Sequence, residues 1–317
     1  MGAPETCKIC AGPLALRYPG TAADVTATLL SPTNHRPGEY GDLYRCERCG
    51  TLHQPRLPPG SELAELYRQM RDDAYLAEEA GRRRTARRVL DLIARHAPSG
   101  RLLDVGCGHG LLLDEARRRG YATEGIEVSE SAVAHARGAL GLTIHEQPFA
   151  DADLEPESYD VIVLADVLEH FDDPRAALRR CGRLLRPGGL LCVVTPDPAS
   201  RTARLAGARW WALLPAHTFL IPWRTLRELL AGEQLVAIDD APLVRSFTAG
   251  YWLAGLAERG GRLAAPVETL RRLLPRRLHL SLSLGDERVL LARRAASPRA
   301  HAPAAPREGS PEPAASA

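Results

Sequence analysis

The stretch that most constrains the fold runs from Leu102 to Gly110 and reads LLDVGCGHG. Its first four residues, apolar apart from one aspartate, predict a short buried strand, and residues 111–119 predict a helix that ends at Gly120. Three glycines at alternate positions turn the strand into the helix. Because glycine has no Cβ and accepts positive φ, such a turn lets a nucleoside ligand lie against the backbone. The stretch therefore predicts a strand–turn–helix unit of an α/β nucleotide-binding sheet.

An acidic residue stands near the end of the next predicted strand. Residues 122–128 form that strand, and Glu127 lies about 20 residues beyond the glycines, where α/β nucleotide sites place the carboxylate that binds ribose hydroxyls. Dinucleotide-binding enzymes use G-x-G-x-x-G, however, and here Gly110 comes one residue too early. An NAD-type site is therefore the second interpretation of this unit, not the first.

Four motifs in this order resemble those of the class I S-adenosylmethionine-dependent methyltransferases. They are the Asp104-x-Gly-x-Gly-x-Gly run and residues 125–129, 160–174 and 184–196, so the resemblance covers about residues 100–240. It implies a Rossmann-like α/β fold with a seven-stranded, mostly parallel sheet, and S-adenosylmethionine as the cofactor. The cofactor-binding residues that it implies are Asp104, Gly106, Cys107, Gly108, Gly110, Glu127, Val128, Phe149, Asp151, Asp166 and Val167.

Polar residues follow the predicted strand 161–164, beyond whose carboxyl end an open α/β sheet binds its ligands. Methyl transfer from a sulfonium is an in-line displacement, in which an oxygen or carbon nucleophile must lose a proton. Histidine titrates near neutrality and suits that role. We therefore predict that Glu169 and His170 are catalytic. His217 resembles a family histidine found near the substrate and is the other candidate base.

The resemblance leaves three roles open for His170. The Glu169–His170 pair resembles that of sugar C-methyltransferases, in which the histidine is the base. It also resembles quinone O-methyltransferases, whose Glu-x-x-Glu-His supplies a divalent metal, although here the first acid is Asp166, which has a shorter side chain. In the third role His170 only positions the cofactor loop through a hydrogen bond.

A strongly basic helix is predicted over residues 74–96. We interpret its arginines as a solvated face on the helix that caps the sheet. The alternative is that Tyr75 or an early arginine lies over the methionine carboxylate of the cofactor.

Two C-x-x-C pairs, Cys7/Cys10 and Cys46/Cys49, precede the core. Four thiolates in two such pairs bind one tetrahedral Zn²⁺ and leave no open coordination position. A redox role is disfavoured because there are two pairs and no thioredoxin-like strand before them, and disulfides are disfavoured by the predicted compartment. We predict a structural zinc.

Composition limits the partners and the compartment. The chain has 317 residues, of which 45% are hydrophobic, enough for one α/β core and a small accessory unit. A net charge of +2 and the lack of a basic stripe do not suggest a nucleic-acid partner. We find neither an apolar run of about 18 residues nor a signal pattern at the N-terminus, and so predict no membrane span and a cytoplasmic location.

The predicted organisation has four parts. Residues 1–58 form the zinc-binding module, 59–98 a helical cap or linker, 99–294 the methyltransferase domain and 295–317 a disordered Ala/Pro-rich tail. Within the methyltransferase domain, apolar insertions at about 200–222 and 246–275 are predicted to cover the substrate or to form a homodimer contact. We expect the second insertion to consist of two helices.

The order of cysteine pair, Tyr44–Gly50 segment and core resembles small-molecule methyltransferases, including sugar C-methyltransferases. We therefore expect methyl transfer to an oxygen or carbon of a small-molecule acceptor, such as a nucleotide-linked sugar or a glycan or natural-product precursor. The alternative is an RNA methyltransferase guided by the zinc module, or a cofactor-dependent RNA-binding protein without catalysis.

Overall fold

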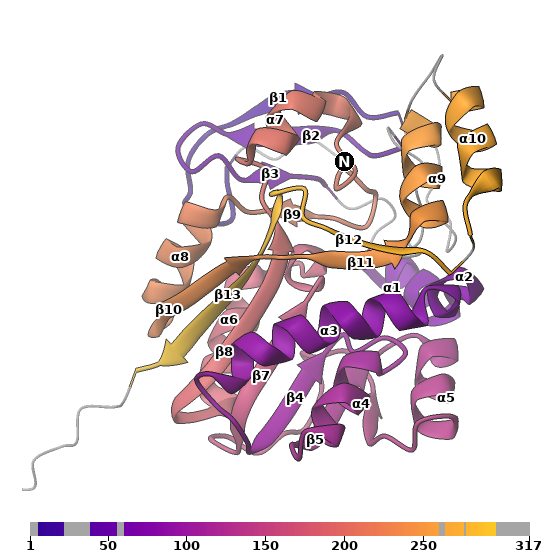
Figure 1. The fold of residues 1–317 in the computed structure, drawn as a ribbon. Helices are drawn as coiled ribbons and strands as arrows, with labels where there is room; N and C mark the ends of the chain where they lie inside the picture. The colour runs from indigo at the N-terminus through magenta and orange to yellow at the C-terminus, as the bar shows by residue number, and fades with distance from the viewer. Residues whose placement is uncertain (1–5, 22–38, 56–59, 260–263, 276, 296–317) are drawn as a thin grey trace, which may run out of the picture.

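A seven-stranded sheet forms the centre of the computed structural model, which describes residues 6–21, 39–55, 60–259, 264–275 and 277–295. Its strand order is β10-β13-β8-β7-β4-β5-β6, and β13 alone runs antiparallel to its neighbours (Figure 1). The predicted fold class is confirmed. The strands are β4 (Arg101–Val105), β5 (Ala122–Glu127), β6 (Ile144–Glu146), β7 (Tyr159–Ala165), β8 (Leu185–Pro196), β10 (Leu235–Pro242) and β13 (Glu287–Arg294).

Helices cover both faces of this sheet. One apolar cluster joins the sheet to α3 (Glu79–Ala94), α4 (Leu111–Arg118) and α5 (Glu130–Gly138). A second cluster joins the other face to α6 (Pro174–Leu184) and α8 (Trp223–Gly232). The central strands are buried on both sides, as their continuous apolar sequences indicate.

The helix starts follow from capping residues. The Ser129 hydroxyl accepts a hydrogen bond from the Ala132 N–H and begins α5. The Asp173 carboxylate accepts one from the Ala176 N–H and begins α6, whose first residue is Pro174. A side-chain oxygen satisfies one of the unpaired N–H groups of a first turn, and proline needs no such partner. Both caps are local features of the sequence.

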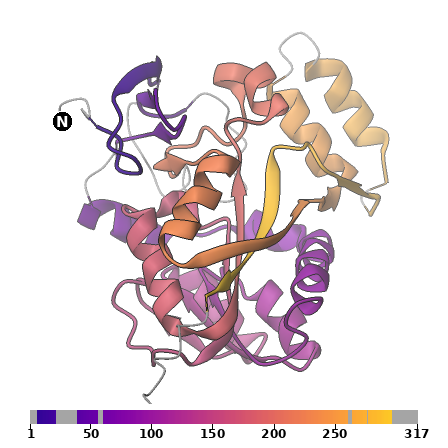
Figure 2. The same ribbon diagram turned by 90° about the vertical axis from the view of Figure 1, so that its left-hand side faces the viewer.

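The N-terminal residues form a smaller sheet that includes a strand from the core. Its order is β1 (Leu14–Tyr18), β2 (Leu43–Cys46), β3 (Leu52–His53) and β9 (Phe219–Leu220), with all pairs antiparallel. Figures 1 and 2 show this sheet at one end of the molecule. Strand β9 belongs to the predicted insertion at 200–222. This insertion therefore pairs directly with the N-terminal unit, whose described residues are 6–21 and 39–55.

The second insertion differs in part from the prediction. Two helices, α9 (Ala249–Arg259) and α10 (Ala264–Leu273), are present as expected. Residues 245–248, however, form strand β11, which pairs antiparallel with β12 (His279–Leu282). A hydrogen bond between the Ser246 and Ser281 hydroxyls (2.6 Å) links the two strands. The prediction missed β12, although LHLSLSL at residues 278–284 alternates as a strand does.

The remaining helices are short. Among the described residues, no helix is long and apolar enough to span a membrane. The tail predicted from residue 295 lies almost wholly outside the described part of the chain, so its disorder stays a prediction. The short helices are α1 (Gly60–Gln69), α2 (Asp73–Ala77), α7 (Arg201–Ala206), and the 3₁₀ helices η2 (Leu168–His170) and η3 (Gly207–Arg209).

Candidate active site and cysteine cluster

A cavity of about 1390 Å³ lies at the carboxyl ends of β4, β5 and β7. Its wall includes the ends of these three strands and residues of both predicted insertions. The predicted site residues that line it are Asp104, Gly106, Cys107, Gly108, Glu127, Val128, Phe149, Asp166, Val167, Glu169, His170 and His217.

The glycine turn is fastened to the neighbouring strand. The N–H groups of Gly106 and Cys107 both donate to the Ile126 carbonyl, at 2.8 and 3.0 Å. Gly108 has a φ of +52°, and the closest neighbour of a Cβ added there would be the Tyr75 hydroxyl, at 4.0 Å. Positive φ favours glycine, and the open space on this side keeps the backbone accessible from the cavity.

Three backbone N–H groups orient the Glu127 carboxylate. Gly108 donates to Oε2 at 2.8 Å, while Val128 and Ser129 donate to Oε1 at 2.8 and 2.9 Å. Two carboxylate oxygens offer about four acceptor positions, so three donors leave capacity for a ligand hydroxyl. The carboxylate is thus fixed by the turn that it faces.

Asp104 and Arg82 place two buried polar groups on the cavity wall. Asp104 is 3% exposed, and burial, with a smaller contribution from Glu127, raises its carboxyl pKa well above the usual value. The Arg82 guanidinium lies 3.7 Å from the centre of the Tyr75 ring, and its buried Nη2 has no hydrogen-bond partner among the described residues. A ligand with an ammonium and a carboxylate would complement both groups.

Two predicted cofactor residues do not line the cavity. A Cβ at Gly110 (φ +79°) would lie 2.5 Å from Leu142 Cδ1 and 3.1 Å from Ala136 Cβ, so this glycine allows the turn to pack against the core. Asp151 is exposed in a turn, where its N–H donates to the Pro148 carbonyl at 3.0 Å. Both residues have local structural roles in this fold.

Asp166, at the end of β7, is held by an arginine that the sequence did not single out. Arg245 Nη2 lies 2.7 and 2.8 Å from the two Asp166 oxygens, and Arg245 Nε donates to Glu287 at 2.8 Å. Burial alone would lower the pKa of Arg245, but Asp166 and Glu287 raise it well above its usual value. Asp166, Arg245 and Glu287 therefore form an ion-pair network on the cavity wall. The backbone of Asp166 also has a positive φ of +57°.

Glu169 is a buried acid that keeps its proton near neutrality. It is 2% exposed, and burial, followed by the negative charge of Asp166, raises its pKa to about 8. The Thr195 hydroxyl donates to Oε2 at 3.1 Å. A carboxyl in this state is a hydrogen-bond donor and a weak metal ligand.

The two histidines have defined tautomers. His170 Nδ1 lies 3.0 Å from the Ala216 carbonyl and 2.9 Å from the Tyr67 hydroxyl. His217 Nδ1 lies 2.7 Å from the Ala212 carbonyl. Because a carbonyl only accepts, these contacts favour the tautomer with the proton on Nδ1 and the lone pair on Nε2 in each ring, although the Tyr67 hydroxyl can accept from or donate to His170 Nδ1.

His217 lies against His170 and is a poor base. Their rings are 4.8 Å apart and nearly perpendicular. Burial, and then the neighbouring His170, lowers the pKa of His217 to about 3, which makes it a poor proton acceptor at neutral pH. Side-chain ligand atoms of Glu169, His170 and His217 lie within 4.8 Å of one another, so a cation is a geometric alternative.

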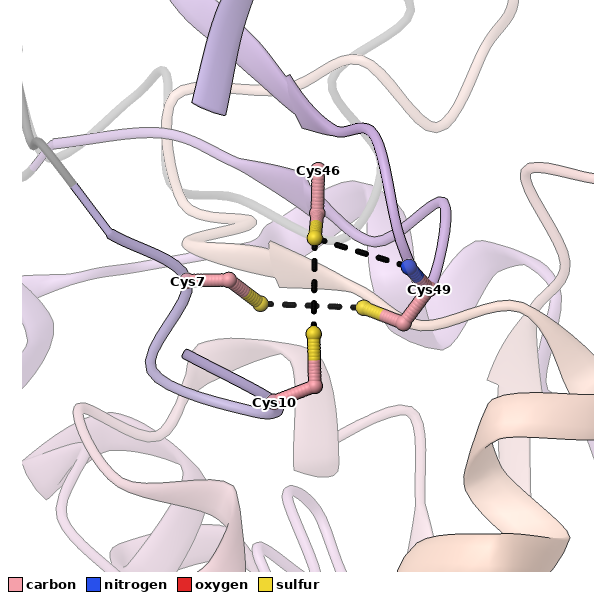
Figure 3. A group of neighbouring side chains, drawn as sticks. All are labelled: Cys7, Cys10, Cys46 and Cys49. Carbon is pink, nitrogen blue, oxygen red and sulfur yellow. Dashed lines mark hydrogen bonds between the residues drawn. The ribbon is translucent and has the colours of Figure 1, made fainter. Parts of the chain in front are cut away.

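The four N-terminal cysteines converge as predicted (Figure 3). The Sγ atoms of Cys7 and Cys49 are 3.6 Å apart, and those of Cys10 and Cys46 are 3.5 Å apart. A disulfide needs about 2.05 Å. Thiolates about 2.3 Å from one tetrahedral metal are about 3.8 Å from each other. The cluster thus has the spacing of a four-thiolate metal site.

Curated relatives share the core of the chain. A ubiquinone biosynthesis O-methyltransferase from Caulobacter vibrioides is 38% identical over 166 residues, which make up 48% of this chain and 65% of that protein. One from Sodalis glossinidius is 29% identical over 50% of this chain and 66% of its own length. The chain therefore spans less than two thirds of the length of each of these two relatives.

Solved structures with similar folds are more distant in sequence. A possible histamine N-methyltransferase from Thermotoga maritima gives a TM-score of 0.48 at 18% identity, covering 69% of this chain and 92% of that one. A 1,6-didemethyltoxoflavin-N1-methyltransferase from Burkholderia thailandensis gives 0.47 at 17% identity, covering 77% and 96%.

The family match extends over the glycine turn, Glu127 and the Glu169–His170 pair. Residues 77–238, just over half of the chain, match the family described as methyltransferase domain. This agrees with the predicted resemblance, which began from the glycine turn and the motifs that follow it. The chain thus belongs to the methyltransferase-domain family of class I, S-adenosylmethionine-dependent enzymes.

Proposed function

We propose that this protein transfers a methyl group from S-adenosylmethionine to an oxygen of a small molecule, with carbon as the second choice of acceptor atom. The observation that carries the proposal is that one cavity joins Asp104 and Glu127 to His170. A nucleoside site and a base therefore open into the same space, as an in-line displacement requires.

The cavity fits the parts of the cofactor. Glu127 would bind the ribose hydroxyls. Asp104 would bind the ammonium group and Arg82 Nη2 would bind the carboxylate, since Asp104 and Arg82 Nη2 are buried polar groups that a ligand of complementary charge would satisfy. Phe149 and Phe171, whose ring centres are 6.0 Å apart, line the wall suited to the adenine. When bound, the sulfonium supplies the electrophilic methyl group.

We assign His170 as the general base. Its Nδ1–H is held by the Ala216 carbonyl, so Nε2 would accept the proton of the acceptor hydroxyl while that oxygen attacks the methyl carbon. His217 would remain neutral beside it. A divalent cation on these side chains is the second choice, because it would have to displace the proton that burial favours on Glu169.

The acceptor class follows from the relatives and the wall of the cavity. The curated relatives are named O-methyltransferases, which favours oxygen. Four aromatic side chains, Trp210, Trp211, Tyr251 and Trp252, line the cavity outside the glycine turn. We propose a hydroxylated small molecule that stacks on aromatic rings, of which nucleotide-linked sugars and natural-product precursors are examples.

We further propose that the four cysteines bind a structural Zn²⁺. The full thiolate set leaves no open position, so its role would be folding and docking. Reduced thiolates favour the cytoplasm as the compartment. The predicted parts (1–58, 59–98, 99–294 and the tail) are kept as proposed units, with the N-terminal unit joined to the core through β9.

Calorimetric titration with S-adenosylhomocysteine tests the cofactor site. Glu127→Ala should weaken binding by roughly 100-fold, since it removes charge-assisted hydrogen bonds worth about 1.5–3 kcal/mol each. Glu124→Ala is the matched control on β5, because Glu124 pairs with Arg101 and does not line the cavity. Wild-type protein that does not bind would contradict the proposed cofactor.

A labelled-methyl assay on phenolic, nucleotide-sugar and RNA acceptors tests the reaction. With an active acceptor, His170→Ala should lower turnover by about 10²–10⁴-fold while the affinity for S-adenosylhomocysteine stays within twofold. Unchanged turnover would leave His170 with a structural role only, and activity on RNA alone would overturn the small-molecule assignment.

A further inference from the structure

Residues 212–221 carry His217 and also Ala216, whose carbonyl contacts His170 Nδ1. This segment has little regular structure of its own. Only two of its residues, Phe219 and Leu220, form a strand. Three carbonyls just before that strand, those of Leu214, Pro215 and His217, converge on one side-chain nitrogen, Nε2 of Gln54, at 2.8, 3.0 and 3.1 Å. An irregular segment therefore takes its backbone partners from the N-terminal unit.

The Gln54 amide is anchored at its other end. Its Oε1 accepts a hydrogen bond from the Gly41 N–H at 2.7 Å, and its own backbone N–H donates to the Thr218 carbonyl at 2.9 Å. The side chain is 5% exposed. One N–H on one side and three carbonyls on the other allow a single orientation of the amide, since only Nε2 donates.

The segment in turn sets the two histidines. The Ala216 carbonyl contacts His170 Nδ1, and the adjacent His217 Nδ1 contacts the Ala212 carbonyl. Thr218 donates through its N–H and its hydroxyl to the Glu169 carbonyl, at 2.9 and 3.1 Å. A shift of residues 212–218 would therefore move acceptors that define both tautomers.

The cysteine cluster contacts His53, the residue that precedes Gln54. His53 Nε2 is 3.1 Å from Cys7 Sγ, and the His53 ring meets Phe219 edge-on at 4.9 Å. Strand β3, which ends at His53, pairs with β9. Gln54 thus directly follows His53, which contacts the cysteine cluster and belongs to the β3–β9 pairing.

We propose that Gln54 is a positioning residue, through which the four-cysteine unit fixes residues 212–218 and thereby the orientation of His170 and His217. Gln54 does not line the cavity, so it acts through the segment and touches neither cofactor nor acceptor. The importance of these histidines for methyl transfer rests on the proposed function. The positioning itself does not.

The test compares two ties between the N-terminal unit and the core. Gln54→Met keeps the length of the side chain and removes its four hydrogen bonds. Thr225→Val is the matched control, because the Thr225 hydroxyl also joins the unit to the core, donating to the Cys49 carbonyl at 2.8 Å, but away from the histidine segment. Proton–nitrogen correlation spectra of ¹⁵N-histidine protein report the tautomers, with His170→Gln and His217→Gln used to assign the signals.

We expect Gln54→Met to shift or broaden the Nδ1–H signals of His170 and His217, while Thr225→Val leaves them as in wild type. Affinity for S-adenosylhomocysteine should stay within twofold in both variants, and turnover in Gln54→Met should fall at least tenfold. If Gln54→Met does not fold, Gln54→Glu gives a second test, because its side chain still accepts from Gly41 but offers at most one donor to the three carbonyls.

Unchanged histidine signals in the Gln54 variant, or equal changes in Thr225→Val, would overturn the proposal. A wild-type protein with the expected histidine signals but no cofactor binding would instead contradict the proposed function. The two failures are therefore distinguishable.

Discussion

The two ends of the cavity are built in different ways. The cofactor end takes Asp104, the glycine turn and Glu127 from one short stretch of chain, and joins them by backbone hydrogen bonds between adjacent strands. The acceptor end takes His170, Ala216 and Arg245 from segments far apart in sequence. Local geometry fixes the first end, whereas the second depends on tertiary contacts, including contacts with the N-terminal unit.

The largest expected effect comes from a substitution in the cysteine cluster, which should disturb the acceptor end without touching it. Cys46→Ser should abolish metal binding and lower the melting temperature by roughly 10 °C, because a structural metal contributes folding free energy directly. Turnover should be lost while some cofactor affinity remains, since the glycine turn is held by hydrogen bonds to Ile126 and Glu127 of β5. Metal analysis and calorimetry measure this.

Cys181→Ala is the control for the loss of a buried thiol, because Cys181 lies in the core and outside the cluster. It should keep the wild-type metal content. Wild-type protein without stoichiometric zinc would contradict the proposed metal.

A smaller effect separates two glycines of the same turn. Gly108→Ala should cost about 1 kcal/mol for positive φ and weaken S-adenosylhomocysteine at least tenfold, because its Cβ would project toward the cavity. Gly110→Ala should destabilise the fold by about 2–4 kcal/mol, since its Cβ would collide with Leu142. Denaturant unfolding and titration calorimetry measure both.

The reverse result, in which Gly110→Ala chiefly affects binding and Gly108→Ala chiefly affects stability, would contradict the placement of the cofactor. It would also restore Gly110 to the cofactor-binding set predicted from sequence.

The last prediction concerns the proton on Glu169, and its size depends on pH. Its folded pKa of about 8 lies above the ordinary glutamate value of 4.5, so its contribution to stability is present below the lower value and is lost as pH rises through the higher one. Glu169→Gln removes this loss. From about pH 5 to 8 the variant should gain stability relative to wild type by up to ~1.4 kcal/mol per pH unit.

Unfolding curves at several pH values measure this difference, with Glu228→Gln as the exposed control. A difference that does not depend on pH would show that Glu169 is ionised throughout.

The sequence predicted most of the sheet and most of the residues that line the proposed cofactor end. Alternating glycines, Glu127 and the Ser129 and Asp173 caps are local signals, and each predicts a local structure. The same signals could not separate Gly108 from Gly110, because both need positive φ and only packing against Leu142 distinguishes them.

The acceptor end was predicted only in part. His170 and His217 were named, but Gln54, Tyr67 and Arg245 were not. Their contacts with Pro215, His170 and Asp166 each join residues more than 75 positions apart. A glutamine after a C-x-x-C pair has no local pattern that indicates three distant carbonyls. Strand β9 is only two residues long and depends on β3, so no periodicity could reveal it.

The pairing of β3 with β9 bears on how such a chain can be inherited or re-engineered. The stretch that matches the family begins at residue 77, beyond the whole N-terminal unit, yet Leu52 and His53 complete a sheet with Leu220 and Phe219. A recombination that exchanged the first 58 residues alone would separate the two halves of that sheet. The exchangeable cassette is therefore discontinuous, and residues 212–221 would have to travel with the cysteines.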